Sequence, residues 1–122
     1  MNTSGKKILV IDDDQRHLTA VKEILEMEGH VIYTYYQPFG ASQVARKLDP
    51  DLILLDVNMP GLSGGALSRV ISSYSKAAIV FYSSNDEDTL RQMVKSHRVK
   101  GYICKGDIFN LRTKVASYLM QD

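Results

Sequence analysis

The sequence has almost no cysteine, almost no net charge and no long apolar run. Cys104 is the only cysteine, which excludes an intrachain disulfide and favours a reducing compartment. The 15 Lys and Arg residues nearly balance the 14 Asp and Glu residues, so the chain lacks the basic excess of a typical nucleic-acid-binding domain. No apolar run approaches the ~20 residues of a membrane-spanning helix, and the polar first residues do not resemble a signal peptide. These absences predict a cytoplasmic protein that binds neither nucleic acid nor membrane directly.

The length of 122 residues fits one globular domain, which we predict over residues 6–120, after a polar leader at residues 1–5. Apolar runs alternate along it with segments of helical periodicity. The apolar runs predict strands at 8–11, 31–35, 52–55, 78–82 and 101–104. The remaining segments predict helices at 15–28, at 41–48, from the end of the 59–65 loop to about 73, at 86–96 and at 107–120. Five strands alternating with five helices indicate a doubly wound α/β domain.

Polar side chains collect where the predicted strands end, and in a doubly wound sheet ligands bind beyond these carboxyl ends. The ends of the first, third, fourth and fifth strands carry Asp12, Asp13, Asp14, Asp56, Ser83 and Lys105. If the first and third strands are neighbours, Asp12, Asp13 and Asp56 converge, and their mutual repulsion requires cations nearby. Lys105 supplies one positive charge. Carboxylate ligands without a Cys or His set favour Mg²⁺ or Mn²⁺ as the second cation.

This arrangement predicts chemistry at phosphorus. A carboxylate beside a divalent metal and a lysine can act as a nucleophile and form an aspartyl phosphate. The metal and Lys105 would offset the charge of the transferring group, and Ser83 could donate a hydrogen bond to one of its oxygens. Any single aspartate, above all Asp12 or Asp14, is more simply explained as a helix cap. The coincidence at four strand ends favours the functional interpretation.

Four segments, in this order along the chain, resemble the receiver domain of bacterial two-component response regulators. They are residues 8–14 (ILVIDDD), 50–64 (PDLILLDVNMPGLSG), 81–84 (FYSS) and 101–105 (GYICK). The resemblance covers about residues 6–120. It implies a (βα)5 flavodoxin-like three-layer sandwich whose central five-stranded parallel sheet has the strand order 2-1-3-4-5. It also implies a phosphorylation switch in a phosphorelay rather than an enzyme, with self-phosphorylation from small phosphodonors and autodephosphorylation.

The resemblance assigns phosphoryl transfer and metal binding to particular residues. Asp56 would accept a phosphoryl group from a histidine kinase or a histidine phosphotransfer protein. Mg²⁺ (or Mn²⁺) would be held by Asp12, Asp13, Asp56 and the backbone carbonyl of Asn58. Lys105 would contact a phosphoryl oxygen.

The resemblance also implies a switch that transmits the modification. Ser83 would move toward the phosphoryl group, and Tyr102 would change rotamer with it. Asn58 and Asn85 occupy positions that influence phosphoryl lifetime in this family. The fourth helix, fifth strand and fifth helix would present the changed surface to an unknown output domain or target protein, or to a second copy in a phosphorylation-dependent homodimer.

Two positions depart from the family pattern. Gly106 replaces the proline that commonly follows the lysine, often through a cis peptide bond. We predict a trans bond between Lys105 and Gly106, because a cis bond before a non-proline residue costs about 2.5–4 kcal/mol. Arg98 and Val99 stand where the family often has Gly-Ala, which predicts a locally different turn. Neither departure touches the acidic residues, so competence for phosphorylation should persist.

Two alternatives to the receiver hypothesis follow from the same residues. One is a small phosphatase with an Asp-x-Asp nucleophile at Asp12 and Asp14, which leaves the segment around Asp56 unexplained. The other is an interaction module that works without phosphorylation. The intact set of acidic residues, with Ser83 and Lys105, argues against such a loss of the phosphorylation site.

The remaining reactive side chains are given no functional role. His17, His30 and His97 are too scattered in the sequence for a metal site, and we predict surface or structural roles for them. Cys104 is predicted to behave as a small apolar residue in a buried strand.

Overall fold

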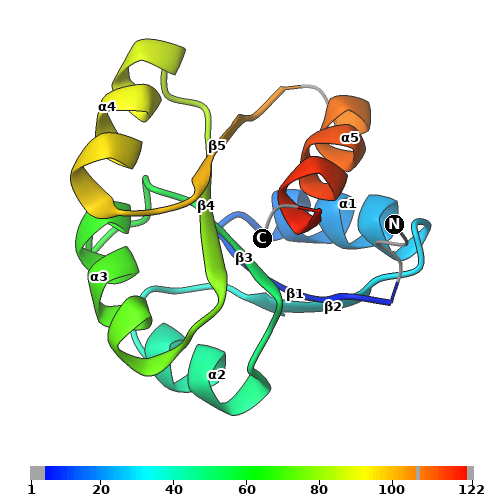
Figure 1. The fold of residues 1–122 in the computed structure, drawn as a ribbon, viewed down its shortest axis with the longest axis horizontal. Coiled ribbons are helices and arrows are strands. Elements are labelled where there is room, and N and C mark those ends of the chain that lie inside the picture. The colour runs from blue at the N-terminus through cyan, green and yellow to red at the C-terminus, as the bar shows by residue number, and fades with distance from the viewer. Residues whose placement is uncertain (1–4, 107, 121–122) are drawn as a thin grey trace.

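The computed structural model describes residues 5–106 and 108–120 (Figure 1). The strands are β1 (Lys7–Ile11), β2 (Val31–Tyr35), β3 (Leu52–Leu55), β4 (Ala78–Ser83) and β5 (Gly101–Cys104). The helices are α1 (Gln15–Glu26), α2 (Ala41–Leu48), α3 (Gly64–Tyr74), α4 (Glu87–His97) and α5 (Ile108–Leu119). Within the described ranges, no helix is long and apolar enough to cross a membrane. Of the predicted polar leader only Gly5 is described, and Asp107, the predicted first residue of the last helix, lies outside the described residues.

The five strands run parallel in one sheet in the order β2-β1-β3-β4-β5, which confirms the predicted flavodoxin-like fold. Helices α1 and α5 cover one face of this sheet, and α2, α3 and α4 cover the other (Figure 1). Strand β1 pairs with both β2 and β3, so that Ile11 lies opposite Tyr35 on one side and Leu55 on the other. The carboxyl ends of β1 and β3 are therefore neighbours.

Two apolar cores, one on each face of the sheet, hold the three layers together. Because side chains alternate along a strand, Ile8 and Val10 of β1 join the core under α1 and α5, whereas Leu9 and Ile11 join the opposite core. The helices complete the first core with Leu18, Val21, Leu25, Leu111 and Val115, and the second with Ala41, Ala45, Leu67, Ile71 and Leu90. Parallel strands covered on both faces carry continuous apolar runs, as β1 and β3 do here. This packing gives the residues after each strand a rigid base.

The turns on either side of β5 show how the chain accommodates its two departures from the family pattern. The bond between Lys105 and Gly106 is trans, as predicted. Arg98 follows α4 with φ 55°, in the left-handed conformation that glycine adopts without steric cost. Arg98 therefore takes the backbone conformation that a glycine would take, at the steric cost of its Cβ atom. The expectation of a locally different turn remains a prediction.

Replacing Arg98 with glycine is expected to raise the free energy of unfolding by about 0.5–1 kcal/mol. Glycine removes the steric cost at positive φ, and the greater freedom of glycine in the unfolded chain cancels part of that gain. Urea denaturation of wild type, Arg98→Gly and Arg98→Ala measures the effect. Arg98→Ala keeps the Cβ atom and should show no gain, so equal stabilisation by alanine would contradict the explanation.

Candidate functional site

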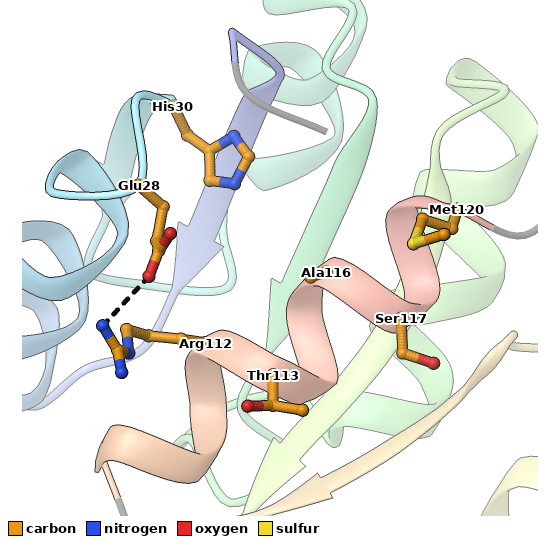
Figure 2. A pocket seen from close by; sticks show the side chains of 7 residues that line it. All are labelled: Glu28, His30, Arg112, Thr113, Ala116, Ser117 and Met120. Carbon is orange, nitrogen blue, oxygen red and sulfur yellow. Dashed lines mark ion pairs between the residues drawn. The ribbon is translucent and has the colours of Figure 1, made fainter. Parts of the chain in front are cut away.

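A cavity of about 510 Å³ lies between the turn after α1 and helix α5, beside the start of β2 (Figure 2). Glu28 and Arg112 form an ion pair of 3.1 Å at its edge. His30 also lines the cavity; its side chain is buried, and its Nδ1 atom has no hydrogen-bond partner among the described residues. The group of potential metal ligands found in the described part of the chain lies elsewhere, at the carboxyl ends of the strands.

Burial lowers the pKa of His30, which gives the stability of the protein a dependence on pH. The fold favours the neutral imidazole. As the medium becomes acidic, the unfolded chain therefore binds more protons at His30 than the folded chain does. The contribution of neutral His30 is fully present above the ordinary histidine pKa of about 6.5 and is lost as the pH falls through the lower folded pKa. We expect wild type to lose more stability than His30→Leu between about pH 7 and pH 5, measured by urea denaturation. Parallel losses in both proteins would contradict this assignment.

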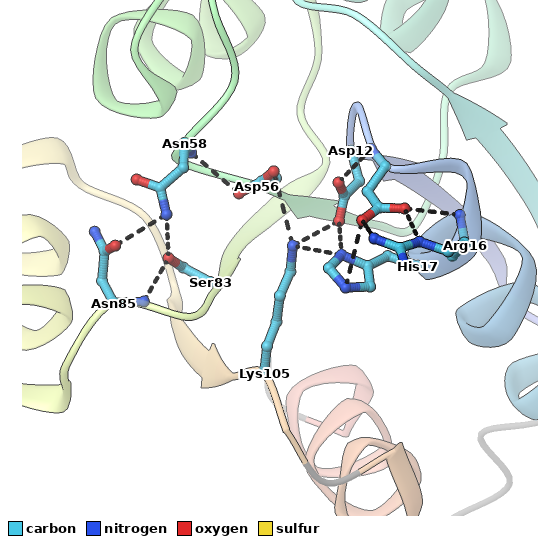
Figure 3. Close-up of polar contacts among 9 residues, drawn as sticks. Asp12, Arg16, His17, Asp56, Asn58, Ser83, Asn85 and Lys105 are labelled. Carbon is cyan, nitrogen blue, oxygen red and sulfur yellow. Dashed lines mark hydrogen bonds and ion pairs between the residues drawn. The ribbon is translucent and has the colours of Figure 1, made fainter.

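Three carboxylates meet at the carboxyl ends of β1 and β3. Figure 3 shows two of them, Asp12 and Asp56. The Asp56 backbone N–H donates to the Ile11 carbonyl at 2.9 Å, which extends the strand pairing up to the aspartates. Oxygen atoms of Asp12, Asp13 and Asp56 all lie within 4.8 Å of one another. Asp12 is 1% exposed and Asp56 is 4% exposed, whereas Asp13 lies at the exposed rim. The structure therefore brings together the three aspartates that the sequence predicts, and we call this the acidic pocket.

Lys105 reaches the acidic pocket from the end of β5. Its backbone N–H donates to the Ser83 carbonyl at 2.8 Å, so the pairing of β4 with β5 sets where the side chain begins. Its ammonium donates to Asp12 Oδ2 at 2.7 Å and lies 3.7 Å from Asp56 Oδ2. The ring of Tyr82 lies below the ammonium, with its centroid 5.3 Å from Nζ, in cation–π contact. In this structure the ammonium donates a hydrogen bond to Asp12 and forms a longer ion pair with Asp56.

The acidic pocket carries more negative than positive charge, since three carboxylates face one ammonium. Burial raises the pKa of Asp56, and the neighbouring Asp12 adds to this rise. The Asn58 N–H, which donates to Asp56 Oδ1 at 3.0 Å, and the Lys105 ammonium oppose it. A divalent cation would relieve the repulsion among the carboxylates, and carboxylate oxygens are the ligands that Mg²⁺ and Mn²⁺ prefer. The residues present therefore fit such a cation.

Asn58 connects Asp56 with the end of β4. While its backbone N–H binds Asp56, its side-chain Nδ2 donates to Ser83 Oγ at 3.1 Å and to Asn85 Oδ1 at 2.9 Å (Figure 3). Ser83 is fully buried, and its Oγ also accepts from the Asn85 backbone N–H at 3.0 Å. Two fixed donors therefore hold the hydroxyl of Ser83, so any movement of Ser83 must break bonds to Asn58 and Asn85.

Tyr102 lies on β5 and connects that strand with both neighbouring helices. Its hydroxyl donates to Glu87 Oε1 of α4 at 2.6 Å, and this bond raises the pKa of Tyr102. Its backbone N–H donates to the Tyr118 hydroxyl at 3.0 Å, and the same hydroxyl donates to the Tyr102 carbonyl at 3.1 Å. The Tyr118 ring lies so close to Gly101 that a Cβ atom there would overlap the ring. Tyr102 thus contacts α4 through its side chain and α5 through its backbone.

Cys104 differs from the interpretation of the sequence, whereas Asp14 confirms the simpler interpretation as a helix cap. Cys104 is exposed, so the prediction of a buried apolar role is wrong. The reason is the alternation of β5, which buries Ile103 and turns the next side chain outward. Asp14 caps α1 by accepting from the Arg16 N–H at 2.9 Å, and its bonds with Arg16 lower the pKa of Asp14 to about 2.

His17 is a polar residue at the acidic pocket that the sequence interpretation missed. Its Nδ1 lies 3.2 Å from Lys105 Nζ and 3.4 Å from Asp12 Oδ2 (Figure 3). Its position in the sequence could have indicated this place. His17 lies on the first turn of α1, directly after the β1 aspartates, and that turn begins at the carboxyl end of the strand.

Comparison with known proteins agrees with the fold described above. A family model described as the response regulator receiver domain matches residues 8–116. The nitrate/nitrite response regulator protein NarL of Escherichia coli (strain K12) is 35% identical over 108 residues, which cover 85% of this chain and 50% of that protein. The transcriptional regulatory protein DegU of Brevibacillus brevis is 31% identical over 108 residues, which cover 86% of this chain and 46% of that protein. The chain thus spans half or less of the length of these two relatives.

Among solved structures, the BeF3-activated N-terminal receiver domain of Klebsiella pneumoniae RstA superposes with a TM-score of 0.85 at 25% identity. The match covers 94% of this chain and 99% of that one.

Proposed function

The chain belongs to the family of response regulator receiver domains, which act in two-component signalling, and on that premise we propose that Asp56 is its phosphoryl acceptor. The donor would be the phosphohistidine of a histidine kinase or of a histidine phosphotransfer protein. The observation that carries the proposal is the surroundings of Asp56: a buried carboxylate beside Asp12, Asp13 and the Lys105 ammonium.

The proposed transfer uses the residues of the acidic pocket in distinct ways. A carboxylate oxygen of Asp56 forms a bond to phosphorus while the bond from phosphorus to the donor nitrogen breaks and the histidine leaves. Asp12, Asp13, Asp56 and the backbone carbonyl of Asn58 would hold Mg²⁺ or Mn²⁺, which offsets charge on the transferring group when bound. Lys105 would donate to a phosphoryl oxygen. Its ammonium lies 3.7 Å from Asp56 Oδ2, which supports this role.

The proposed output begins at Ser83 and ends at the surface of α4, β5 and α5. A phosphoryl group adds about −1.5 to −2 charge and three acceptor oxygens. Ser83 would break its hydrogen bonds with Asn58 and Asn85 and donate to one of the phosphoryl oxygens. Tyr102 would break its hydrogen bond with Glu87. The changed surface would act on an output domain or target protein, or on a second copy of the chain.

The test is intact-mass spectrometry after incubation with Mg²⁺ and acetyl phosphate. Wild type should gain one phosphoryl group, about 80 Da, that is lost on standing, as expected for an acyl phosphate. Asp56→Ala should gain nothing, whereas Asp88→Asn, which removes an exposed carboxylate of α4, should behave as wild type. If wild type gains no mass, titration with beryllofluoride separates rapid hydrolysis, in which the complex still forms, from an interaction module, in which it does not.

The phosphatase hypothesis makes a different prediction in the same experiment. A mass gain that persisted in Asp56→Ala but vanished in Asp12→Ala would move the nucleophile to the end of β1. The structure offers this hypothesis little support, because Asp14, its second carboxylate, caps α1 and pairs with Arg16.

A further inference from the structure

His17 contacts Lys105 at the edge of the acidic pocket, and the proposed phosphoryl transfer gives it no role. An ammonium carries three N–H donors and no acceptor. At 3.2 Å from Lys105 Nζ, His17 Nδ1 must therefore be the acceptor of that hydrogen bond. The ring proton then lies on Nε2, which is 3.8 Å from Asp14 Oδ2. The contact with Lys105 thus fits the tautomer of His17 in which Nδ1 is the acceptor.

The three donors of Lys105 face three different groups. One donates to Asp12 Oδ2 at 2.7 Å and a second to His17 Nδ1 at 3.2 Å. The remaining side of the ammonium faces Asp56 Oδ2 at 3.7 Å, which is too long for a hydrogen bond. The Lys105 side chain is only 11% exposed.

Lys105 also has space into which it could turn away from Asp56. A cavity of about 240 Å³ adjoins the acidic pocket and is lined by His17, Ala20, Tyr82, Lys105, Gly106 and Ile108. The backbone after the lysine adds freedom, because Gly106, at φ 132°, lacks the rigidity of the proline usual in this family. The direction of the ammonium therefore depends on its side-chain partners.

We propose that His17 is a positioning residue for Lys105, an inference that rests on the proposed function. With one donor bound to Asp12 and another to His17, the third donor points to the place where a phosphoryl oxygen on Asp56 would lie. Orientation of a catalytic side chain before the reaction lowers the barrier of transfer more than it strengthens binding of the donor. His17 would therefore affect the maximal rate of phosphorylation rather than the concentration of donor that it needs.

Three substitutions separate this role from a structural one. His17→Asn places an amide oxygen near the position of Nδ1, His17→Gln places its amide near the position of Nε2, and His17→Leu removes the acceptor. Phosphorylation by acetyl phosphate is followed by intact mass over a range of donor concentrations. In His17→Leu and His17→Gln the maximal rate should fall about tenfold with little change in the half-saturating concentration, and His17→Asn should recover most of the rate.

A second readout observes the Lys105 contact directly. In the beryllofluoride complex, the fluorine that accepts from Lys105 should have a ¹⁹F resonance that shifts in His17→Leu and His17→Gln but not in His17→Asn. Wild-type rates and unshifted resonances in all three variants would overturn the role of His17. An equal loss of the maximal rate in His17→Asn and His17→Gln would overturn it as well. Failure of wild type itself to take up phosphoryl or beryllofluoride would instead overturn the proposed function.

Discussion

The variant Asp56→Asn is expected to be more stable than wild type by about 1–2 kcal/mol at neutral pH without metal. Asp56 is 4% exposed, close to two other carboxylates, and 3.7 Å from the single ammonium that faces it. An asparagine has nearly the same shape and keeps an oxygen to accept from the Asn58 N–H. The substitution removes a repelled buried charge without opening a cavity, so it should stabilise the fold while it abolishes the proposed modification.

The pH dependence of this gain follows from the raised pKa of Asp56. The folded protein retains the Asp56 proton to higher pH than the unfolded chain does. Stability due to this group is therefore highest below the unfolded pKa of about 3.9 and falls as pH rises through the higher folded pKa. The advantage of asparagine should be larger at neutral pH than near pH 3, where the Asp56 carboxyl is protonated and both side chains are neutral.

Urea denaturation of both proteins in EDTA at the two pH values measures the gain. Asp88→Asn is the matched control, because that carboxylate is exposed and should change stability little at either pH. An Asp56→Asn protein less stable than wild type at neutral pH would show that the Asp56 charge is well compensated.

Replacing Lys105 with methionine is expected to cost about 2–3 kcal/mol of stability without metal. Methionine keeps most of the apolar stem but removes the ammonium that donates to Asp12 at 2.7 Å, and Asp12 is 1% exposed. Mg²⁺ should restore much of this loss, and it should bind Lys105→Met more tightly than wild type, because the variant lacks the positive charge that repels the cation.

Thermal unfolding in EDTA and in saturating MgCl₂ measures both effects. Lys22→Met, on the exposed face of α1, controls for the loss of one positive charge. A destabilisation of Lys105→Met that Mg²⁺ leaves unchanged would mean that the cation does not enter the acidic pocket. A loss that Mg²⁺ reverses would place the cation and the ammonium at the same carboxylates.

The parts of this site that lie on strand ends could be predicted from the sequence. Continuous apolar runs define the strands, and the residue after each run lies at the same edge of the sheet, which is why Asp12, Asp56 and Lys105 converge. The interactions missed by that reasoning depend on loop paths and helix rotation. The bond from Asn58 to Asn85 joins two loops 27 residues apart, and the contact of His17 with Lys105 spans 88 residues.

Other differences arise from how a single element packs. His30 precedes a strand and has no apolar pattern of its own, yet it is buried beneath α5. Arg98 takes a conformation that its residue type disfavours, because the short turn into β5 determines its backbone. Cys104 is exposed although its neighbour Ile103 is buried, because side chains alternate between the two faces along β5.

The bonds between Tyr118 and Tyr102 have a consequence for how the sheet can grow. The outer edge of an edge strand normally offers free N–H and C=O groups, to which another strand can add. On β5 the Tyr118 hydroxyl already occupies both outward groups of Tyr102. A peptide could extend the sheet here only after Tyr118 had swung away from both. This edge is therefore protected against strand addition and against sheet-to-sheet aggregation, and a partner at this side would recognise helix side chains rather than join the sheet.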